Sequence, residues 1–288
     1  MPAYNAGYYI KEAIESVVNQ TFKDWELIII DNNSEDNTRS IISNFRDSRI
    51  HYLEINNHGS IAKSRNYGIK NSIGKYIAFL DADDYWSVDK LNKCINRMGV
   101  GKYSLVAHHL SIVGNKSGEI ISGPENSTTF NDILYKRNCY TPSAVILNRK
   151  IIEDAGYFDE RDQLITAEDY HLWIKIAYMR PKVAIINEKL GYYRSHDLNH
   201  SGKIEKHMNA NLFVLEDCHN VYSNSNIQKF YKIIRKAKIY YGAGRAYYIK
   251  DDFIISIKVL MRSLMYNPLN IKVYITILLS VMKIFYKK

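Results

Sequence analysis

The sequence has little cysteine. Cys94, Cys139 and Cys218 are its only three thiols among 288 residues, and their spacing matches no metal site. A sparse, odd-numbered set of cysteines argues against a disulfide-stapled fold and favours reduced thiols in the cytosol. Stability must therefore come from a hydrophobic core, and a chain of this length is long enough to bury one.

Acidic residues are scarce in the last third of the chain. Residues 201–288 contain 15 Lys or Arg and only 5 Asp or Glu, whereas residues 1–200 contain 24 and 25. The whole excess of positive charge therefore lies in the C-terminal part. A basic tail of this kind indicates a nucleic-acid partner, a membrane surface or a solvated helical face, and composition alone leaves the three open.

The same region lacks an apolar run long enough to cross a membrane. Residues 273–282 are uncharged and lie between Lys272 and Lys283. Ten residues are too few for a hydrocarbon layer of about 30 Å, but flanking lysines suit a helix that lies in the interface. Packing on the rest of the protein is the alternative. Helical spacing recurs through 212–221, 227–248, 243–264 and 269–285, which predicts a helical extension over residues 201–288.

The first part of the chain alternates between predicted helices and strands. Ile10, Ala13, Ile14, Val17 and Val18 recur at helical spacing. Apolar strands are predicted at 26–30, 50–55 and 76–80, with helices between them, one of them over residues 60–71. This alternation predicts an α/β fold with a doubly wound, mainly parallel sheet and helices on both faces.

Three carboxylates follow the last of these strands. Asp81, Asp83 and Asp84 come directly after residues 76–80, and ligands of open α/β sheets bind outside the carboxyl ends of the strands. Clustered carboxylates repel one another unless a cation lies among them, and their oxygens suit Mg²⁺ or Mn²⁺. The alternative is a polar loop in which Asp84 caps the next helix.

Short motifs follow one another in order along residues 1–200. They are Pro2-x-Tyr4-Asn5, Asn19-Gln20-Thr21-Phe22, Ile30-Asp31-Asn32-Asn33-Ser34, Ala62-x-x-Arg65-Asn66-x-Gly68-Ile69, Phe79-Leu80-Asp81-Ala82-Asp83-Asp84, Pro142-Ser143-Ala144-Val145-Ile146, Gly156-Tyr157-Phe158-Asp159-Glu160, Glu168-Asp169-Tyr170-His171-Leu172-Trp173 and Tyr193-Arg194-Ser195-His196. Each motif is weak by itself. Together they resemble the family 2 glycosyltransferases of the GT-A fold, of the bacterial surface-polysaccharide type.

The resemblance implies an activity and its partners. It implies an inverting, metal-dependent glycosyltransferase that uses Mn²⁺ or Mg²⁺. The donor would be a nucleotide-diphosphate sugar, with a UDP-sugar favoured, and the acceptor a hydroxyl of a saccharide or of a polyprenyl-linked saccharide. The setting would be capsule or lipopolysaccharide synthesis, with the enzyme peripheral on the inner face of the cell membrane. In that setting the basic tail is expected to meet an anionic membrane surface and no nucleic acid.

The matching positions also imply roles for individual residues. Asp169 would be the catalytic base, with Glu168 in support, and Asp83 and His196 would bind the metal. The nucleotide-sugar-binding residues would be Pro2, Tyr4, Asp31, Asn33, Arg65, Asp81 and Asp83.

Several of these residues have plain structural alternatives. Asp31 or Ser34 can cap a helix, and Asp169 can cap the helix that it begins. Arg65, expected to meet phosphate or base, can instead form a surface ion pair. His196 can be an ordinary surface or packed side chain.

The chain departs from the family pattern in two places. In the family a strand precedes the Pro2-x-Tyr4-Asn5 loop, so we expect the first strand of the domain to lie upstream of Met1. Asn32 stands where a second aspartate is usual, which changes the donors and acceptors offered to a nucleobase.

Two other functions share some of these features. A metal-dependent nucleotidyltransferase also places acidic metal ligands on an α/β sheet. Such an enzyme is expected to have a Gly-rich, basic phosphate-binding loop near its start, and residues 2–7 lack one. A catalytically inactive glycosyltransferase-like binding protein is the other alternative.

Overall fold

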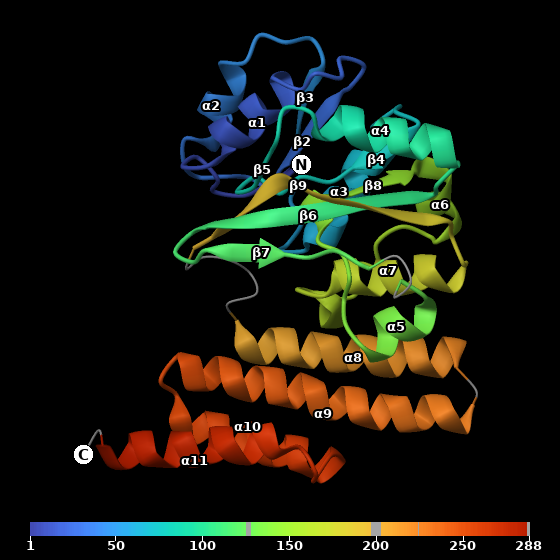
Figure 1. Ribbon diagram of the computed structural model, residues 1–288. Coiled ribbons are helices and arrows are strands. Elements are labelled where there is room, and N and C mark those ends of the chain that lie inside the picture. The colour runs from blue at the N-terminus through green and yellow to red at the C-terminus, as the bar shows by residue number, and fades with distance from the viewer. Residues whose placement is uncertain (125–127, 197–202, 224, 287–288) are drawn as a thin grey trace. The chain divides into compact units, whose positions relative to one another are not determined.

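The computed structural model describes residues 1–124, 128–196, 203–223 and 225–286 (Figure 1). The chain forms two compact units. The N-terminal unit comprises Met1–Ile133, Asn138–Asp162 and Glu168–Asn199, and the C-terminal unit comprises Leu134–Arg137, Gln163–Ala167 and His200–Lys288. Each unit is described by itself below.

The N-terminal unit holds all of the strands in the described part of the chain. In chain order its elements are β1 (Pro2–Ala3), α1 (Ile10–Val18), β2 (Leu27–Asp31), α2 (Thr38–Ser43), β3 (Ile50–Glu54), α3 (Ile61–Lys70), β4 (Tyr76–Ala78), β5 (Tyr85–Trp86), α4 (Lys90–Gly101), β6 (Leu105–Gly114), β7 (Gly118–Ile120), η2 (Pro142–Ala144), β8 (Val145–Asn148), α6 (Arg149–Asp154), α7 (Glu168–Tyr178) and β9 (Val183–Ser195). Two short helices, α5 (Phe130–Tyr135) and η3 (Asp162–Leu164), include residues of both units.

The strands form two sheets. The first has the order β1-β2-β3 and is parallel throughout, with Leu27 opposite Ile50. Every residue of β2 is buried, as expected for a parallel strand that is covered on both faces. The second sheet has the order β4-β8-β6-β9-β5, and β7 pairs with β6.

The second sheet is mixed, which differs in part from the mainly parallel prediction. β6 and β9 are parallel, whereas β4 and β6 both pair antiparallel with β8, and β5 pairs antiparallel with β9. β4 is also shorter than the predicted strand, since it ends at Ala78. Phe79 and Leu80 are nonetheless buried, so their apolar character reflects packing at the start of the acidic loop.

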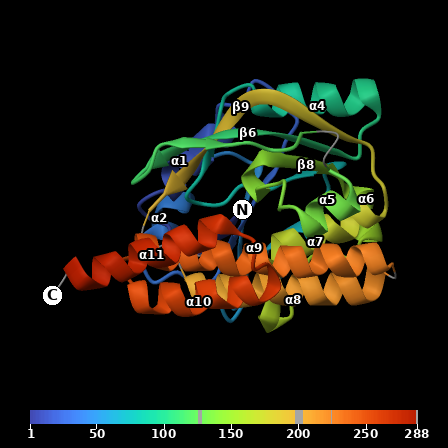
Figure 2. The same ribbon diagram turned by 60° about the horizontal axis from the view of Figure 1, so that its bottom comes forward.

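Helices cover both faces of the second sheet. α4 and α7 lie on opposite sides of β6 in both views (Figures 1 and 2). The apolar stripe predicted for the first helix is buried except for Val18, which is half-buried, and Ile10, Ala13 and Ile14 are inaccessible to solvent. Burial of a continuous stripe of this kind, rather than helix propensity, stabilises a helix of nine residues.

The C-terminal unit is helical. It contains α8 (Ile204–Tyr222), α9 (Asn226–Ile249), α10 (Phe253–Tyr266) and α11 (Ile271–Tyr286). Successive helices pack on one another, and α8 lies beside α9 in Figure 1. The helical patterns predicted at 227–248 and 243–264 correspond to α9 and α10, which are separated after Ile249, where Asp251 has a φ of 62°. No helix in the described ranges is long and apolar enough to span a membrane.

Candidate active site

A buried arginine connects two groups of carboxylates in the N-terminal unit. Arg65 lies on α3, and its guanidinium donates from Nη1 to Glu168 Oε1 (2.7 Å) and from Nη2 to Asp81 Oδ1 (2.9 Å). The Arg65 side chain is only 4% exposed, and it lies over the Phe158 ring. Burial alone would lower the pKa of Arg65, but Asp81 and Glu168 raise it above its ordinary value. The arginine is therefore a permanent cation between the acidic loop and the start of α7.

The alternative of a surface ion pair is wrong for Arg65, and its predicted contact with the nucleotide stays a prediction. The sequence suggested a contact with phosphate or base, or a surface ion pair, whereas the structure gives the guanidinium two carboxylate partners in the interior. A fork of parallel donors suits such a bridge, because each guanidinium nitrogen can bind a different carboxylate. The partner Glu168 is 103 residues away in the chain, so no local motif could reveal the pairing.

The acidic loop is held in place by its third aspartate. Asp84 accepts hydrogen bonds from Ser143 Oγ (2.6 Å) and from the Arg194 backbone amide (2.9 Å). Burial raises the pKa of Asp84, and the nearby Asp83 and Asp81 raise it further. The predicted alternative of a helix cap is wrong for Asp84, because α4 begins only at Lys90. The side chain instead ties the loop to η2 and β9.

Arg194 supports the same loop from the end of β9. Its Nε donates to the Asp83 carbonyl oxygen (3.1 Å), and its guanidinium lies over the rings of Tyr9 and Tyr85 and pairs with Glu12. Neither Arg194 nor Ser143 was predicted as a site residue. Both residues stand inside motifs that the sequence analysis singled out. Their contacts join residues far apart in the chain, so the motifs alone did not reveal their roles.

Asp83 and His196, the two predicted metal ligands, are in direct contact. His196 Nε2 is 2.9 Å from Asp83 Oδ2, and the imidazole stacks on Tyr9 with 4.9 Å between ring centroids. Burial raises the pKa of Asp83, and repulsion from Asp81 raises it further, against the opposing effect of His196. A carboxylate oxygen and an imidazole nitrogen at contact distance fit a divalent cation, which would relieve this repulsion.

Asp31 ends β2 and is fully buried. Its Oδ1 accepts hydrogen bonds from the Ser34 hydroxyl and amide, and its Oδ2 accepts one from Tyr52 Oη (2.9 Å). It does not cap a helix, since α2 begins at Thr38. Nearby, Asn32 Oδ1 accepts from the Asn57 amide (2.8 Å), so this amide orders the loop after β3. Tyr52 was missed by the sequence interpretation because it lies on the neighbouring strand.

The other residues predicted to bind the nucleotide sugar lie in or next to β1 and β2. Pro2 belongs to β1 and pairs with Ile30 of β2. Tyr4 is 57% exposed. Asn33 is exposed and has a φ of 52°, a conformation that asparagine adopts more readily than most residues.

Asp169 lies in the first turn of α7 beside the arginine bridge. It is partly buried, and its Oδ1 accepts a hydrogen bond from the Tyr170 amide (2.7 Å). Burial raises the pKa of Asp169 to about 7, Glu168 raises it too, and Arg65 opposes the rise. A carboxyl group that titrates near neutral pH can take up and release a proton under physiological conditions.

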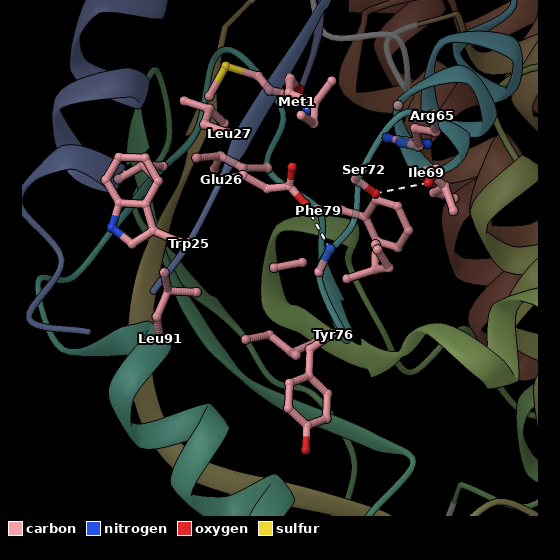
Figure 3. Close-up of a pocket in the computed structure, with 18 of the residues that line it drawn as sticks. Met1, Trp25, Glu26, Leu27, Arg65, Ile69, Ser72, Tyr76, Phe79 and Leu91 are labelled. Atoms are coloured by element: carbon pink, nitrogen blue, oxygen red, sulfur yellow. Dashed lines mark hydrogen bonds between the residues drawn. The ribbon is translucent and has the colours of Figure 1, made fainter. Parts of the chain in front are cut away.

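A cavity of about 570 Å³ is lined by residues of β2, α3 and β4 (Figure 3). Its lining is mainly apolar and includes Trp25, Leu27 and Phe79. Glu26 reaches across one side, where its carboxylate accepts from the amides of Ile73 (2.6 Å) and Gly74 (2.7 Å). The cavity shares Arg65 with the site, but it does not contain the carboxylates of Asp31, Asp83 or Asp169.

The N-terminal unit is thus an α/β unit in which Arg65 joins the acidic loop after β4 to the carboxylates that begin α7. Residues 1–156 match the model of "Glycosyl transferase family 2". The chain therefore belongs to glycosyl transferase family 2 and is a glycosyltransferase. This match confirms the predicted family and the predicted glycosyltransferase activity, whereas metal dependence stays a prediction.

Two relatives from Escherichia coli are named as UDP-Glc:alpha-D-GlcNAc-diphosphoundecaprenol beta-1,3-glucosyltransferases. One, WfgD, is 35% identical over 179 residues, which is 61% of this chain and 67% of the relative. The other, WfaP, is 34% identical over 196 residues, or 67% of this chain and 75% of the relative.

The fold is also similar to that of a solved structure. The crystal structure of residues 1–349 of Staphylococcus aureus TarS in complex with UDP aligns with a TM-score of 0.62 at 18% identity. The alignment covers 93% of this chain and 79% of that one. Together with the family match, it confirms the predicted GT-A-like fold with a C-terminal helical region.

Proposed function

We propose that this glycosyltransferase moves a hexose or N-acetylhexosamine from a UDP-sugar to a hydroxyl of a saccharide carried on a polyprenyl diphosphate. The Escherichia coli relatives, whose names specify a UDP-sugar and a diphosphoundecaprenol acceptor, support this choice of substrates. The observation that carries the proposal is the Arg65 bridge, which holds the donor-side Asp81 and the base-side Glu168 at a fixed separation.

On the donor side, the strand ends would bind the nucleotide. Asp31 would accept hydrogen bonds from uracil or ribose through the lone pairs that Ser34 and Tyr52 leave available. Pro2, Tyr4 and Asn33 would border the nucleotide, and Asp81 would face the ribose. In this proposal Arg65 orients Asp81 and does not bind phosphate.

A divalent cation, Mn²⁺ or Mg²⁺, would be held by Asp83 and His196. Bound there it would neutralise the charge that develops on the departing diphosphate. Arg194 and Asp84 would keep the loop in position, since both fix its backbone.

On the acceptor side, Asp169 would remove the proton from the attacking hydroxyl. The acceptor oxygen then forms a bond to the anomeric carbon, and the bond from that carbon to the diphosphate oxygen breaks with its electron pair. Attack from the face opposite the leaving group inverts the anomeric configuration. Glu168 would support the base through Arg65, and a pKa near 7 suits proton transfer at neutral pH.

An acceptor on a polyprenyl lipid would place the reaction at a membrane. We therefore propose peripheral association with the inner face of the cell membrane, in the assembly of a capsule or lipopolysaccharide. The net charge of the last third of the chain supports an anionic surface as partner.

The test is a transfer assay with the full chain, Mn²⁺, a set of UDP-sugars and a synthetic GlcNAc-diphosphate lipid. Mass spectrometry should find one added hexose or N-acetylhexosamine, lost when Asp169→Asn replaces the wild type. If the folded chain binds UDP but adds no sugar from any donor to this lipid, the proposed acceptor class is wrong.

A further inference from the structure

The last helix, α11, buries small polar residues and exposes large apolar ones, the reverse of an ordinary surface helix. The buried residues of α11 are Val273, Thr276 and Ser280, and two of these three carry hydroxyl groups. The large apolar side chains point away from the neighbouring helices: Leu278 is 60% exposed and Phe285 is 73% exposed. A helix that only packs in water buries its large apolar residues and exposes its polar ones.

The buried hydroxyl groups of α11 have hydrogen-bond partners. Thr276 Oγ1 donates to the Lys272 carbonyl oxygen and Ser280 Oγ donates to that of Thr276, both at 2.8 Å. Ser280 Oγ also lies 3.4 Å from Ser256 Oγ on α10. These hydroxyl groups are therefore satisfied mainly by carbonyl oxygens of α11 itself, so burying this face leaves no polar group of theirs without a partner.

The outer face is a continuous apolar stripe. Its members recur every three or four residues, so they share one side of the helix. The exposed apolar and aromatic residues of α11 are Ile271, Tyr274, Ile275, Leu278, Leu279, Met282, Phe285 and Tyr286. A stripe of this size on a soluble surface marks an interaction site.

Charge indicates what covers this stripe. Between Phe253 and Lys288 the chain has six basic residues and no acidic one, and Lys272 and Lys283 are exposed at opposite ends of α11. Two copies meeting through this face would bring like charges together without a carboxylate from the segment to pair them. An anionic bilayer offers both an apolar interior for the stripe and phosphate groups for the lysines.

We propose that the outer face of α11, from Ile271 to Tyr286, is a membrane-docking surface that lies flat in the interface of an anionic bilayer. Sixteen residues span about 24 Å, less than the hydrocarbon thickness, so the helix lies along the surface. This inference extends the proposed function, because a lipid-linked acceptor would be presented at such a surface.

The test is sedimentation of the full chain with vesicles of phosphatidylcholine alone or with about one third phosphatidylglycerol. Wild type should bind the anionic vesicles at low salt and be partly released by high salt. Leu278→Glu/Phe285→Glu should lose at least tenfold in binding. The matched control is Val221→Glu/Ile227→Glu, which replaces side chains that are 65% and 66% exposed on α8 and α9 and should bind like the wild type.

A second readout reports insertion directly. The three native cysteines are buried, so Leu278→Cys offers one accessible thiol for an environment-sensitive dye. Its emission should shift to the blue on anionic vesicles, while the same dye on Val221→Cys should not shift. An unshifted dye at position 278, or vesicle binding by Leu278→Glu/Phe285→Glu equal to that of the wild type, would overturn the proposal. So would a stable dimer in solution that this double variant dissociates.

Transfer to a water-soluble, short-chain acceptor separates this inference from the proposed function. Loss of vesicle binding with transfer intact would leave the enzyme assignment standing and place the defect in α11. Vesicle binding by a chain that transfers no sugar would instead support the docking surface and contradict the proposed function.

Discussion

Arg65 balances a site that would otherwise hold unpaired negative charge in the interior. Its two ion pairs are short, and its side chain is almost inaccessible to solvent. An isolated buried carboxylate is costly, so removing one partner of such a network destabilises a protein more than losing a surface pair. The arginine is therefore expected to serve both the stability of the unit and the geometry of the reaction.

Arg65→Lys should reveal both contributions. A lysine keeps the charge but cannot bind Asp81 and Glu168 with separate planar donors, so unfolding free energy should fall by about 1.5–3 kcal/mol. Turnover should fall by about 10²-fold, because the base shifts relative to the donor. The control is Arg39→Lys, whose ion pair with Glu54 is largely exposed and should be worth less than about 1 kcal/mol. Equal effects of the two substitutions in urea unfolding would contradict the bridge.

Asp83 is predicted to link nucleotide binding to the metal. Calorimetry should show that EDTA weakens UDP binding to the wild type, because the diphosphate loses its cation. Asp83→Asn should bind weakly with or without EDTA and keep its fold. Asp154→Asn, on the half-exposed end of α6, is the control. Identical affinity of the wild type in Mn²⁺ and in EDTA would contradict a metal at this site.

At the scale of elements, the C-terminal helices depend on close approach at Gly244. A Cβ atom added there would lie 2.6 Å from Leu260 Cγ and Cδ2, whereas one added at Gly242 would meet nothing within 4 Å. Ser256 Oγ also donates to the Gly244 carbonyl oxygen (2.8 Å). α9 and α10 therefore pack through a glycine at this point.

Gly244→Ala and Gly242→Ala should shift stability in opposite directions. The first should cost about 1–3 kcal/mol through overpacking against Leu260. The second should gain up to about 1 kcal/mol, because alanine is the better helix former. Thermal unfolding followed by circular dichroism measures both. A higher Tm for both variants would show that α9 and α10 do not approach closely at Gly244.

The spacing of apolar residues predicted individual helices and strands, which are visible in a short stretch of sequence. The apolar spacing of Ile10 to Val17 and the helix over 60–71 correspond closely to α1 and α3, and β2 was predicted within one residue at each end. The antiparallel pairing of β4 with β8 could not be predicted this way, because its partners are far apart in the chain. Periodicity likewise showed that the last helix is amphipathic, but not that its small hydroxyl residues are the buried face.

The residue types of the candidate site could be predicted from the sequence, whereas the contacts between them could not. The acidic loop, Asp31, Asp169 and His196 stand in motifs, so their types and order pointed to them. The contacts that fix them come from residues remote in sequence, such as Tyr52 for Asp31 and Ser143 for Asp84. Such pairings depend on tertiary packing, which local spacing does not encode.

At the scale of the whole molecule, one buried lysine should make stability depend on pH. Lys90 Nζ lies 3.5 Å from the centroid of the Trp86 ring and has no hydrogen-bond partner among the residues that the structure describes. Burial lowers the pKa of Lys90 from 10.5 to about 7. Between these two values the unfolded chain binds more protons than the folded chain, so stability rises with pH across this window.

Lys90→Met should remove that dependence. Methionine fills similar space without a charge, so the variant should be more stable than the wild type at pH 7. Its urea midpoint should also change less between about pH 7 and pH 10. The control is Lys11→Met, at a position that is 69% exposed, and it should follow the wild type. A pH dependence for Lys90→Met as steep as that of the wild type would mean that other groups cause it.

The carboxyl group of Asp169 should make stability depend on pH in the opposite direction to Lys90. Its pKa is raised from 3.8 to about 7, so the folded state binds more protons than the unfolded state between these values, and stability falls as pH rises through them. Asp169→Asn should therefore be at least as stable as the wild type at neutral pH. Loss of activity in this variant would then not reflect unfolding.

The turnover of Asp169→Asn at saturating UDP-sugar tests the central claim most directly. We predict donor affinity close to that of the wild type and a turnover lower by about 10²–10⁴, the usual contribution of a general base. Wild-type turnover should also fall as the pH drops below about 7, as the base becomes protonated. Wild-type turnover in Asp169→Asn, or an equal loss of donor affinity, would contradict the assignment of Asp169 as the base.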